Sequence, residues 1–123
     1  MDSKNTRIQP KQGEIWLFDP DPIKGNELEK KVRPCLVISH NSWNKISTGL
    51  VIIVPLTSVN KEISTHIRVT PPDGGLSVES FALCEQVRSI SRERLVKRTG
   101  VVSHKVLVEV HAWICDLINV DFG

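Results

Sequence analysis

GLVIIVPL, residues 49–56, is a continuous apolar run that is rich in β-branched side chains. A run of this length is too short for an isolated helix and is typical of a strand that is buried on both faces. Shorter runs of strand-forming residues lie on both sides of it and are bounded by proline, glycine or aspartate. The sequence predicts further strands over residues 14–18, 35–39, 63–70, 81–90 and 95–102, with a short helical turn before the last of them.

One helix is predicted at the C-terminal end of the chain. Ser103 can cap a helix that continues to about Asn119. Apolar residues recur along it every three or four positions and form one stripe: Val106, Leu107, Val110, Trp113, Ile114, Leu117 and Ile118. Short strands followed by one amphipathic helix predict a mainly β fold, a small antiparallel β-barrel with a C-terminal α-helix, because closure of the barrel removes exposed sheet edges.

Length and composition predict a single soluble domain. The chain has 123 residues, of which 40% are hydrophobic and 24% charged. We expect residues 1–12 to form a flexible tail and residues 13–123 to form the domain. No apolar run approaches the ~18 residues of a membrane span, and the first twelve residues are too polar for a signal peptide, so we expect a cytoplasmic protein that binds no membrane.

The three cysteines predict neither a disulfide framework nor a metal site. Cys35, Cys84 and Cys115 lie far apart and form no Cys-x-x-Cys pair, so we expect them to be buried small apolar residues. His111 and Cys115 are spaced to share a helix face, but no third ligand stands near them in the sequence.

Positive charge is concentrated in the middle of the chain. Residues 86–98 contain five basic side chains and one acid, a local charge of +4, whereas residues 103–123 contain one lysine and three acids, a local charge of −2. This distribution fits a surface that binds a polyanion on one side of the fold. A solvated charged face is the other interpretation of such a run.

Four segments together resemble a known family. GEIW (residues 13–16), VRPCLVIS (32–39), VPLTS (54–58) and CEQVRSI (84–90) are similar, in this order, to the signature segments of the MazF/PemK toxins. With the final helix, the resemblance covers about residues 13–119. It implies an SH3-like barrel of the CcdB/PemK type that forms a homodimer and binds single-stranded RNA in a groove at or near the subunit interface. It also implies cleavage of RNA by attack of the ribose 2′-hydroxyl, without metal or other cofactor, and inhibition by a cognate antitoxin.

The resemblance implies three catalytic residues. Arg33 matches the family's arginine before proline, and its planar guanidinium binds phosphate oxygens but is too basic for an easy general base. Thr57 matches a hydroxyl that donates to the scissile phosphate. Glu85 aligns with an acid that accepts a proton or holds Arg33 in place. Some members carry an arginine two residues before this acid, where this chain has Leu83, which shifts the catalytic role toward Arg33.

Further residues are candidates for RNA contacts. Lys24 and Asn26 fall in the long connection after the first strand, and Asn26 stands where some members have a histidine. Gln86 and Arg88 alternate along the predicted strand 81–90 and should share a face, suited to a base edge and a phosphate. Two more candidates lie beside the predicted groove, Ser58 and His66. The ordinary alternatives are turn-capping hydroxyls, a solvent-facing histidine and an exposed polar strand face.

Two other functions fit the same expected fold. A CcdB-type toxin poisons a DNA topoisomerase without catalysis and would not require Arg33, Thr57 and Glu85 together. An RNA-binding relative that has lost its activity would not require them either. The presence of all three residues favours the ribonuclease, since fold alone does not separate the three functions.

Overall fold

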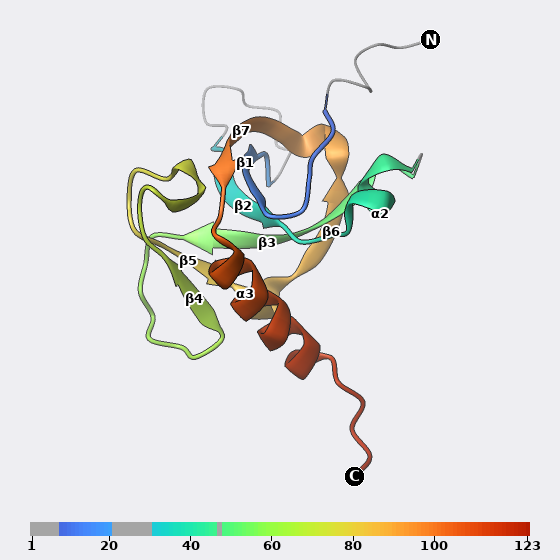
Figure 1. The fold of residues 1–123 in the computed structure, drawn as a ribbon, viewed down its shortest axis with the longest axis vertical. Coiled ribbons are helices and arrows are strands. Elements are labelled where there is room, and N and C mark those ends of the chain that lie inside the picture. The colour runs from blue at the N-terminus through green and yellow to red at the C-terminus, as the bar shows by residue number, and fades with distance from the viewer. Residues whose placement is uncertain (1–7, 21–30, 47) are drawn as a thin grey trace.

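Seven strands form one antiparallel sheet that curls around the chain's core in the computed structural model, which describes residues 8–20, 31–46 and 48–123 (Figure 1). The strands are β1 (Glu14–Phe18), β2 (Arg33–Val37), β3 (Leu50–Thr57), β4 (His66–Val69), β5 (Ser80–Leu83), β6 (Arg88–Ser91) and β7 (Leu95–Val101). Their order is β4-β5-β3-β2-β1-β7, and β6 also pairs with β3. The helical elements are α2 (Asn41–Lys45), α3 (His104–Leu117) and the 3-10 turns η2 (Asp73–Gly75), η3 (Cys84–Gln86) and η4 (Arg92–Arg94).

The central strand β3 uses one edge to pair with two different strands. Its first half pairs with β6, from Leu50 to Ile53, and its last residues pair with β5. The turn η3 carries the chain from one half of this edge to the other. The prediction of a single strand over residues 81–90 is therefore wrong, because this segment is two short strands separated by a turn.

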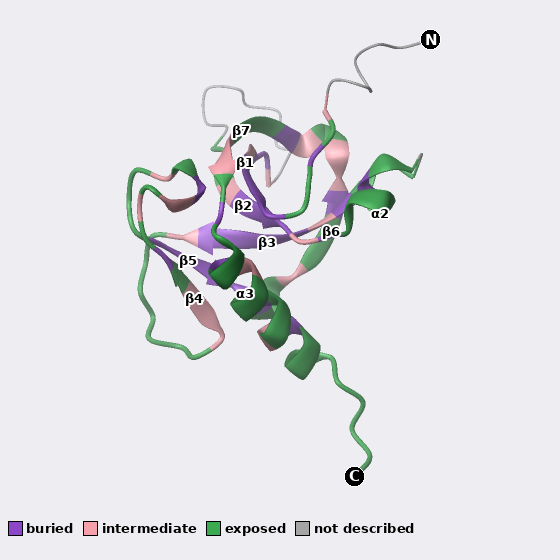
Figure 2. Cartoon of the chain, viewed as in Figure 1, coloured by how far each residue is buried: buried purple, intermediate pink, exposed green. Residues whose placement is uncertain are grey.

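Alternation along the strands places an apolar cluster on each face of the sheet. Leu36, Val54 and Ala82 belong to a cluster that packs beneath α3. The other cluster includes Cys35, Val51 and Ile53 and lies on the opposite face, inside the curl of the sheet. Figure 2 shows these buried positions running along the middle of the fold. The face opposite α3 carries the residues of the candidate site.

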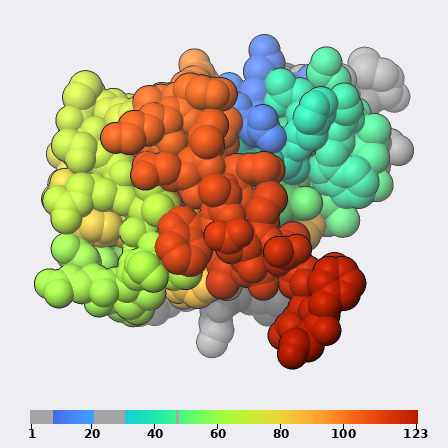
Figure 3. Space-filling model, turned by 60° about the horizontal axis from the view of Figure 1, so that its bottom comes forward, coloured from blue at the N-terminus to red at the C-terminus, as the bar shows by residue number. Residues whose placement is uncertain are grey.

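The C-terminal helix is confirmed, including its cap. The Ser103 side chain accepts a hydrogen bond from the Val106 N–H at 3.3 Å, and Val106, Val110 and Ile114 are buried against the sheet. Figure 3 shows α3 lying across this side of the molecule, with the C-terminal residues projecting beyond it. The predicted apolar stripe continues to Ile118, but this residue is 70% exposed and is the C-cap that follows the last helical residue, Leu117.

The mainly β fold with a C-terminal helix is confirmed, whereas the strand pairing leaves the barrel open. Among the described residues, β4, β6 and β7 each pair with one neighbour only. The sheet is thus strongly curled without a continuous ring of hydrogen bonds. No helix in this part of the chain is both long and apolar enough to cross a membrane.

Two of the three cysteines are buried, as predicted, and the third is not. Burial raises the pKa of both Cys35 and Cys84 to about 12, so these thiols stay protonated. Cys115 lies on the exposed side of α3 with its Sγ 3.6 Å from His111 Nε2, which corrects the expectation of a buried residue. Nowhere in the described ranges do three or more His, Cys, Asp or Glu side chains group as metal ligands.

The turn η2 crosses β7 so closely that only glycine fits, which predicts a large loss of stability for Gly75→Ala. Gly75 has a φ of +72°, and a Cβ there would lie 2.0 Å from the carbonyl oxygen of Thr99. We expect Gly75→Ala to lower the unfolding free energy by roughly 2–5 kcal/mol, from backbone strain and steric overlap together. Chemical denaturation measures this loss.

Gly49 is a matched control for this substitution. Its φ is +75°, but a Cβ there would meet nothing within 4 Å. Gly49→Ala should therefore cost only about 1–2 kcal/mol, the strain of the left-handed conformation. Equal losses for the two variants would show that the contact between η2 and β7 is not tight.

Candidate active site

Strand pairing brings Arg33 and Thr57 to neighbouring strands at the same end of the sheet. Arg33 begins β2, and the register between β2 and β3 pairs Cys35 with Pro55. The paired residues end there, and the same antiparallel register continued by two residues would bring Arg33 opposite Thr57. Side chains at alternate positions share a face, so both project from the face opposite α3. We call this surface the site face.

The same row continues across two more strands. Thr57 pairs with Phe81 of β5, and Phe81 pairs with Arg68 of β4. The row on the site face is therefore Arg33, Thr57, Phe81 and Arg68, and it spans about 14 Å of sheet at about 4.8 Å per strand. Arg68 was not singled out from the sequence, although its alternation with Ile67 and Val69 indicates that it points away from the core.

Arg33 is exposed at the start of β2. Its side chain makes no hydrogen bond or ion pair with any residue that the structure describes. A guanidinium in this state presents its full set of planar donors to phosphate oxygens.

The Thr57 hydroxyl already accepts one hydrogen bond within the protein. It accepts a hydrogen bond from the Val59 N–H at 3.2 Å, which is the turn-capping role expected of such a residue. Its own hydrogen remains able to donate toward a ligand. Ser58 follows it at an exposed position in the same turn. Thr57 thus combines the structural and the donor role.

Glu85 is held by two neighbours. The Thr65 hydroxyl donates to its Oε1 and the His66 Nε2 contacts its Oε2, each at 2.8 Å. Burial acts to raise the pKa of Glu85, but hydrogen bonds from His66, Thr65 and the backbone outweigh it, so the pKa lies below its ordinary value. Both carboxylate oxygens thus contact Thr65 and His66 rather than Arg33. The lowered pKa also makes the Glu85 carboxylate a weaker base.

His66 differs from the exposed strand residue that the sequence led us to expect. Its side chain is only 3% exposed, although the backbone at this position remains accessible. Its Nδ1 is buried and has no hydrogen-bond partner among the described residues. The imidazole contacts Glu85, which is 19 positions away in the chain.

Gln86 and Arg88 are both exposed but do not share a strand. Gln86 ends the turn η3, which corrects the expectation that the two residues alternate along one strand. Arg88 pairs with Ile53 of β3 and so projects from the site face, like Thr57. Lys24 and Asn26 lie outside the described residues.

Two arginines of the positively charged stretch 86–98 make hydrogen bonds within the fold. Arg92 Nη1 donates to the Asn44 carbonyl at 2.6 Å. Arg94 donates through Nε to the Asp19 carbonyl at 2.8 Å and through Nη2 to the Pro20 carbonyl. These arginines tie η4 to α2 and to the end of β1. The predicted polyanion surface is therefore smaller than the charge count suggested.

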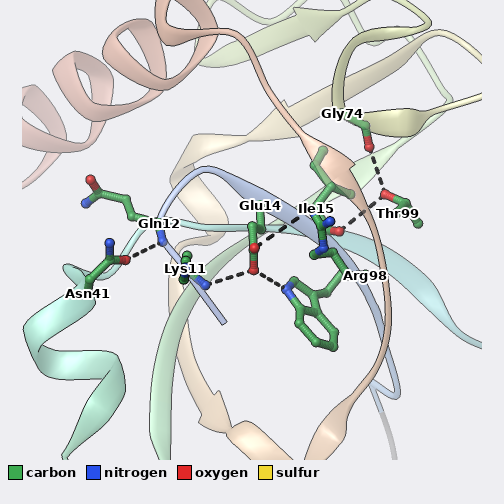
Figure 4. A network of polar contacts seen from close by, with 9 residues as sticks. Lys11, Gln12, Glu14, Ile15, Asn41, Gly74, Arg98 and Thr99 are labelled. Carbon is green, nitrogen blue, oxygen red and sulfur yellow. Dashed lines mark hydrogen bonds and ion pairs between the residues drawn. The ribbon is translucent and has the colours of Figure 1, made fainter. Parts of the chain in front are cut away.

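The first signature segment is also structural. The Glu14 carboxylate is buried and accepts hydrogen bonds from the Trp16 indole N–H at 2.9 Å and the Lys11 N–H at 2.8 Å (Figure 4). Arg98 Nη1 lies 3.8 Å from its other oxygen. A buried carboxylate needs such partners, so Glu14 anchors β1 to the segment before it and to β7.

The lowered pKa of Glu85 predicts how Glu85→Gln changes acid stability. An acid whose native pKa lies below its ordinary value of 4.5 stabilises the fold when ionised, and this contribution is lost as the pH falls through the native pKa. The wild type should exceed Glu85→Gln in unfolding free energy near neutral pH, and the difference should shrink in acid. Urea unfolding of the two proteins, near neutral pH and again at acidic pH, measures this difference in unfolding free energy. A difference that does not change with pH would contradict the lowered pKa of Glu85.

Comparisons with known sequences find a family of toxins. Residues 11–118 match the family model of the PemK-like, MazF-like toxins of type II toxin–antitoxin systems. The chain is 35% identical over 105 residues to endoribonuclease MazF9 of Mycobacterium tuberculosis, covering 81% of this chain and 88% of that protein. It is 29% identical over 101 residues to endoribonuclease MazF of Staphylococcus epidermidis, covering 81% and 83%.

Solved structures show the same fold. The MazF crystal structure from Deinococcus radiodurans superposes with a TM-score of 0.74 at 25% identity, covering 90% of this chain and 97% of that one. A MazE–MazF complex from the same organism gives a TM-score of 0.76 at 26% identity, covering 92% and 99%. With the family model matching most of its length, the chain belongs to the PemK-like, MazF-like toxin family of type II toxin–antitoxin systems.

Proposed function

We propose that this chain is an endoribonuclease toxin that cleaves single-stranded mRNA by attack of a ribose 2′-hydroxyl on the adjacent phosphate, without a metal ion. The observation that carries the proposal is that Arg33 and Thr57 lie on the neighbouring strands β2 and β3, whose pairing turns both side chains to the site face. These groups match what the chemistry requires at the phosphate, a cation and a polar donor. The names of the family relatives support the same activity.

In the proposed reaction the 2′-oxygen forms a bond to phosphorus while the bond to the 5′-oxygen breaks. The products are a 2′,3′-cyclic phosphate and a free 5′-hydroxyl, with one proton leaving the 2′-oxygen and one reaching the 5′-oxygen. Arg33 stabilises the negative charge that grows on the phosphate oxygens, and Thr57 donates to one of them. Both groups act on the transition state more strongly than on the ground state.

Glu85 and His66 take positioning roles in this proposal. The contact between them fixes η3, and η3 carries the exposed Gln86 toward the substrate. Arg88 and Ser58 add phosphate or sugar contacts, and Lys24 and Asn26, which lie outside the described residues, are proposed as further RNA contacts. Since both Glu85 oxygens are engaged, we assign the carboxylate to orientation rather than to proton abstraction.

A homodimer and an antitoxin complete the proposal. MazF of Deinococcus radiodurans has been crystallised with MazE, and the likeness to that complex supports a cognate antitoxin for this chain. An acidic, apolar antitoxin segment that orders on the site face would exclude RNA by occupancy. Action on mRNA places the protein in the cytoplasm.

The experiment that tests the proposed function is incubation of the purified chain with single-stranded RNA, followed by analysis of the fragment ends. Fragments with 5′-hydroxyl and 2′,3′-cyclic phosphate ends are expected at defined sequences. Fragments with 5′-phosphate ends would contradict the 2′-hydroxyl mechanism. Intact RNA would favour the topoisomerase poison or an inactive relative.

A further inference from the structure

Arg68 is fixed in one orientation on the site face without having been assigned a role. Its guanidinium carbon lies 5.4 Å from the centre of the Phe81 ring, and its Nη1 lies 3.2 Å from Glu79 Oε2. The Thr70 hydroxyl donates to the same Glu79 oxygen at 3.2 Å, so the carboxylate is held as well. Phe81 is almost fully buried, whereas the Arg68 side chain is 57% exposed. The guanidinium therefore lies over an aromatic ring, while much of the Arg68 side chain is open to solvent.

This residue shares a row with the catalytic groups. Arg68 pairs with Phe81, and Phe81 pairs with Thr57, so two strand spacings, about 10 Å, separate Arg68 from Thr57 along the site face. Arg33 lies on the other side of Thr57. A strand of RNA whose phosphate is held by Arg33 and Thr57 can thus extend over Arg68 with a neighbouring nucleotide.

The chemistry around Arg68 favours a base over a phosphate as its ligand. Glu79 occupies one edge of the guanidinium, neutralises much of its charge and would repel a phosphate brought to that edge. The Arg68 side chain is otherwise 57% exposed, and guanidinium planes stack on unpaired RNA bases. An ordinary exposed ion pair would need neither the aromatic ring beneath it nor the second donor on the acid.

We propose that Arg68, supported by Phe81 and Glu79, is a stacking platform for an RNA base that flanks the scissile phosphate. The inference rests on the proposed function, because it takes the site face as the RNA-binding surface. Arg68 is on this account a binding residue that influences substrate choice, and Glu79 and Phe81 orient it. Its loss should weaken RNA binding without removing the groups that act on the phosphate.

Binding to an RNA that cannot be cleaved tests the platform separately from catalysis. The probe is a short single-stranded RNA with 2′-O-methyl groups throughout, of the sequence that the wild type cleaves fastest, or of mixed sequence if it cleaves none. Arg68→Ala should raise Kd by about 5- to 100-fold, the range found for loss of one base-stacking side chain. Arg68→Lys should restore little of this, because an ammonium has no plane to stack.

Salt dependence and abasic probes distinguish a base from a phosphate. Loss of a stacked base leaves the log–log salt slope of binding unchanged, whereas loss of a phosphate contact on single-stranded RNA reduces its magnitude by about 0.7. One abasic position in the probe should weaken wild-type binding and have no added effect on Arg68→Ala. Lys105→Ala is the control, since Lys105 is exposed at the start of α3, on the other face of the sheet.

Three results would overturn the platform. They are unchanged binding by a folded Arg68→Ala, full recovery by Arg68→Lys, or a salt slope that falls by about 0.7 in Arg68→Ala. Wild-type protein that cleaves no RNA would contradict the proposed function, while the comparison of binding would still decide whether Arg68 stacks a base.

Discussion

Arg33→Ala is expected to lower the rate of RNA cleavage by about 10² to 10³-fold, the usual cost of losing a donor aimed at developing negative charge. Its melting temperature should stay nearly unchanged, because exposed substitutions typically shift stability by less than ~0.5 kcal/mol. Arg33 is exposed and makes no side-chain bond within the described ranges, so the fold loses nothing but a solvated group. Single-turnover cleavage and thermal unfolding measure the two effects.

Thr57→Val and Lys105→Ala complete this comparison. Valine keeps the shape of Thr57 but removes its hydroxyl, so cleavage should fall less than in Arg33→Ala, with a small loss of stability from the turn contact with Val59. Lys105→Ala removes a cation on the other face of the sheet and should leave cleavage unchanged. A folded Arg33→Ala that cleaves as fast as the wild type would remove the basis of the proposed site.

A single 2′-deoxy nucleotide immediately before the cut should abolish cleavage. The 2′-oxygen is the nucleophile in the proposed reaction, and deoxyribose cannot supply it. Deoxyribose one nucleotide further along is the matched control and should leave cleavage largely intact. The same RNA should be cleaved at an unchanged rate in excess EDTA, since Arg33 and Thr57 supply the charge stabilisation at the phosphate.

The opposite pattern would indicate a different nuclease mechanism. If activity disappears with EDTA and returns with Mg²⁺, or if the deoxy substitution is tolerated, water rather than the 2′-oxygen attacks the phosphate. The proposed roles of Arg33 and Thr57 would then have to be assigned anew, although their place on the site face would stand.

Local signals in the sequence were sufficient for the elements that are stabilised by their own pattern. The strand over residues 14–18, the apolar run of β3 and the Ser103 cap of α3 were all predicted, because each depends on nearby residues. Arg33 and Thr57 were chosen from signature segments, and strand pairing then brought them to the same end of the sheet. Their separation in sequence gave no direct indication that they lie on neighbouring strands.

Features that depend on distant partners were not predictable in the same way. Residues 81–90 have strand composition throughout, and only their pairing with two halves of β3 divides them into β5, η3 and β6. His66 is polar and lies in a strand of alternating pattern, which predicts exposure. Its side chain is nevertheless buried, in contact with Glu85. Arg68 lies on the site face because β4 pairs with β5 and β5 pairs with β3, and these pairings are not visible in the sequence.

Expression of the wild type and Arg33→Ala in growing cells, with all RNA 5′-hydroxyl ends mapped, tests the central claim most directly. The account predicts growth arrest and new ends at defined sequences for the wild type, and neither for Arg33→Ala present at the same level. Growth arrest by both forms with intact RNA, accompanied by DNA breaks, would contradict it and identify a topoisomerase poison instead.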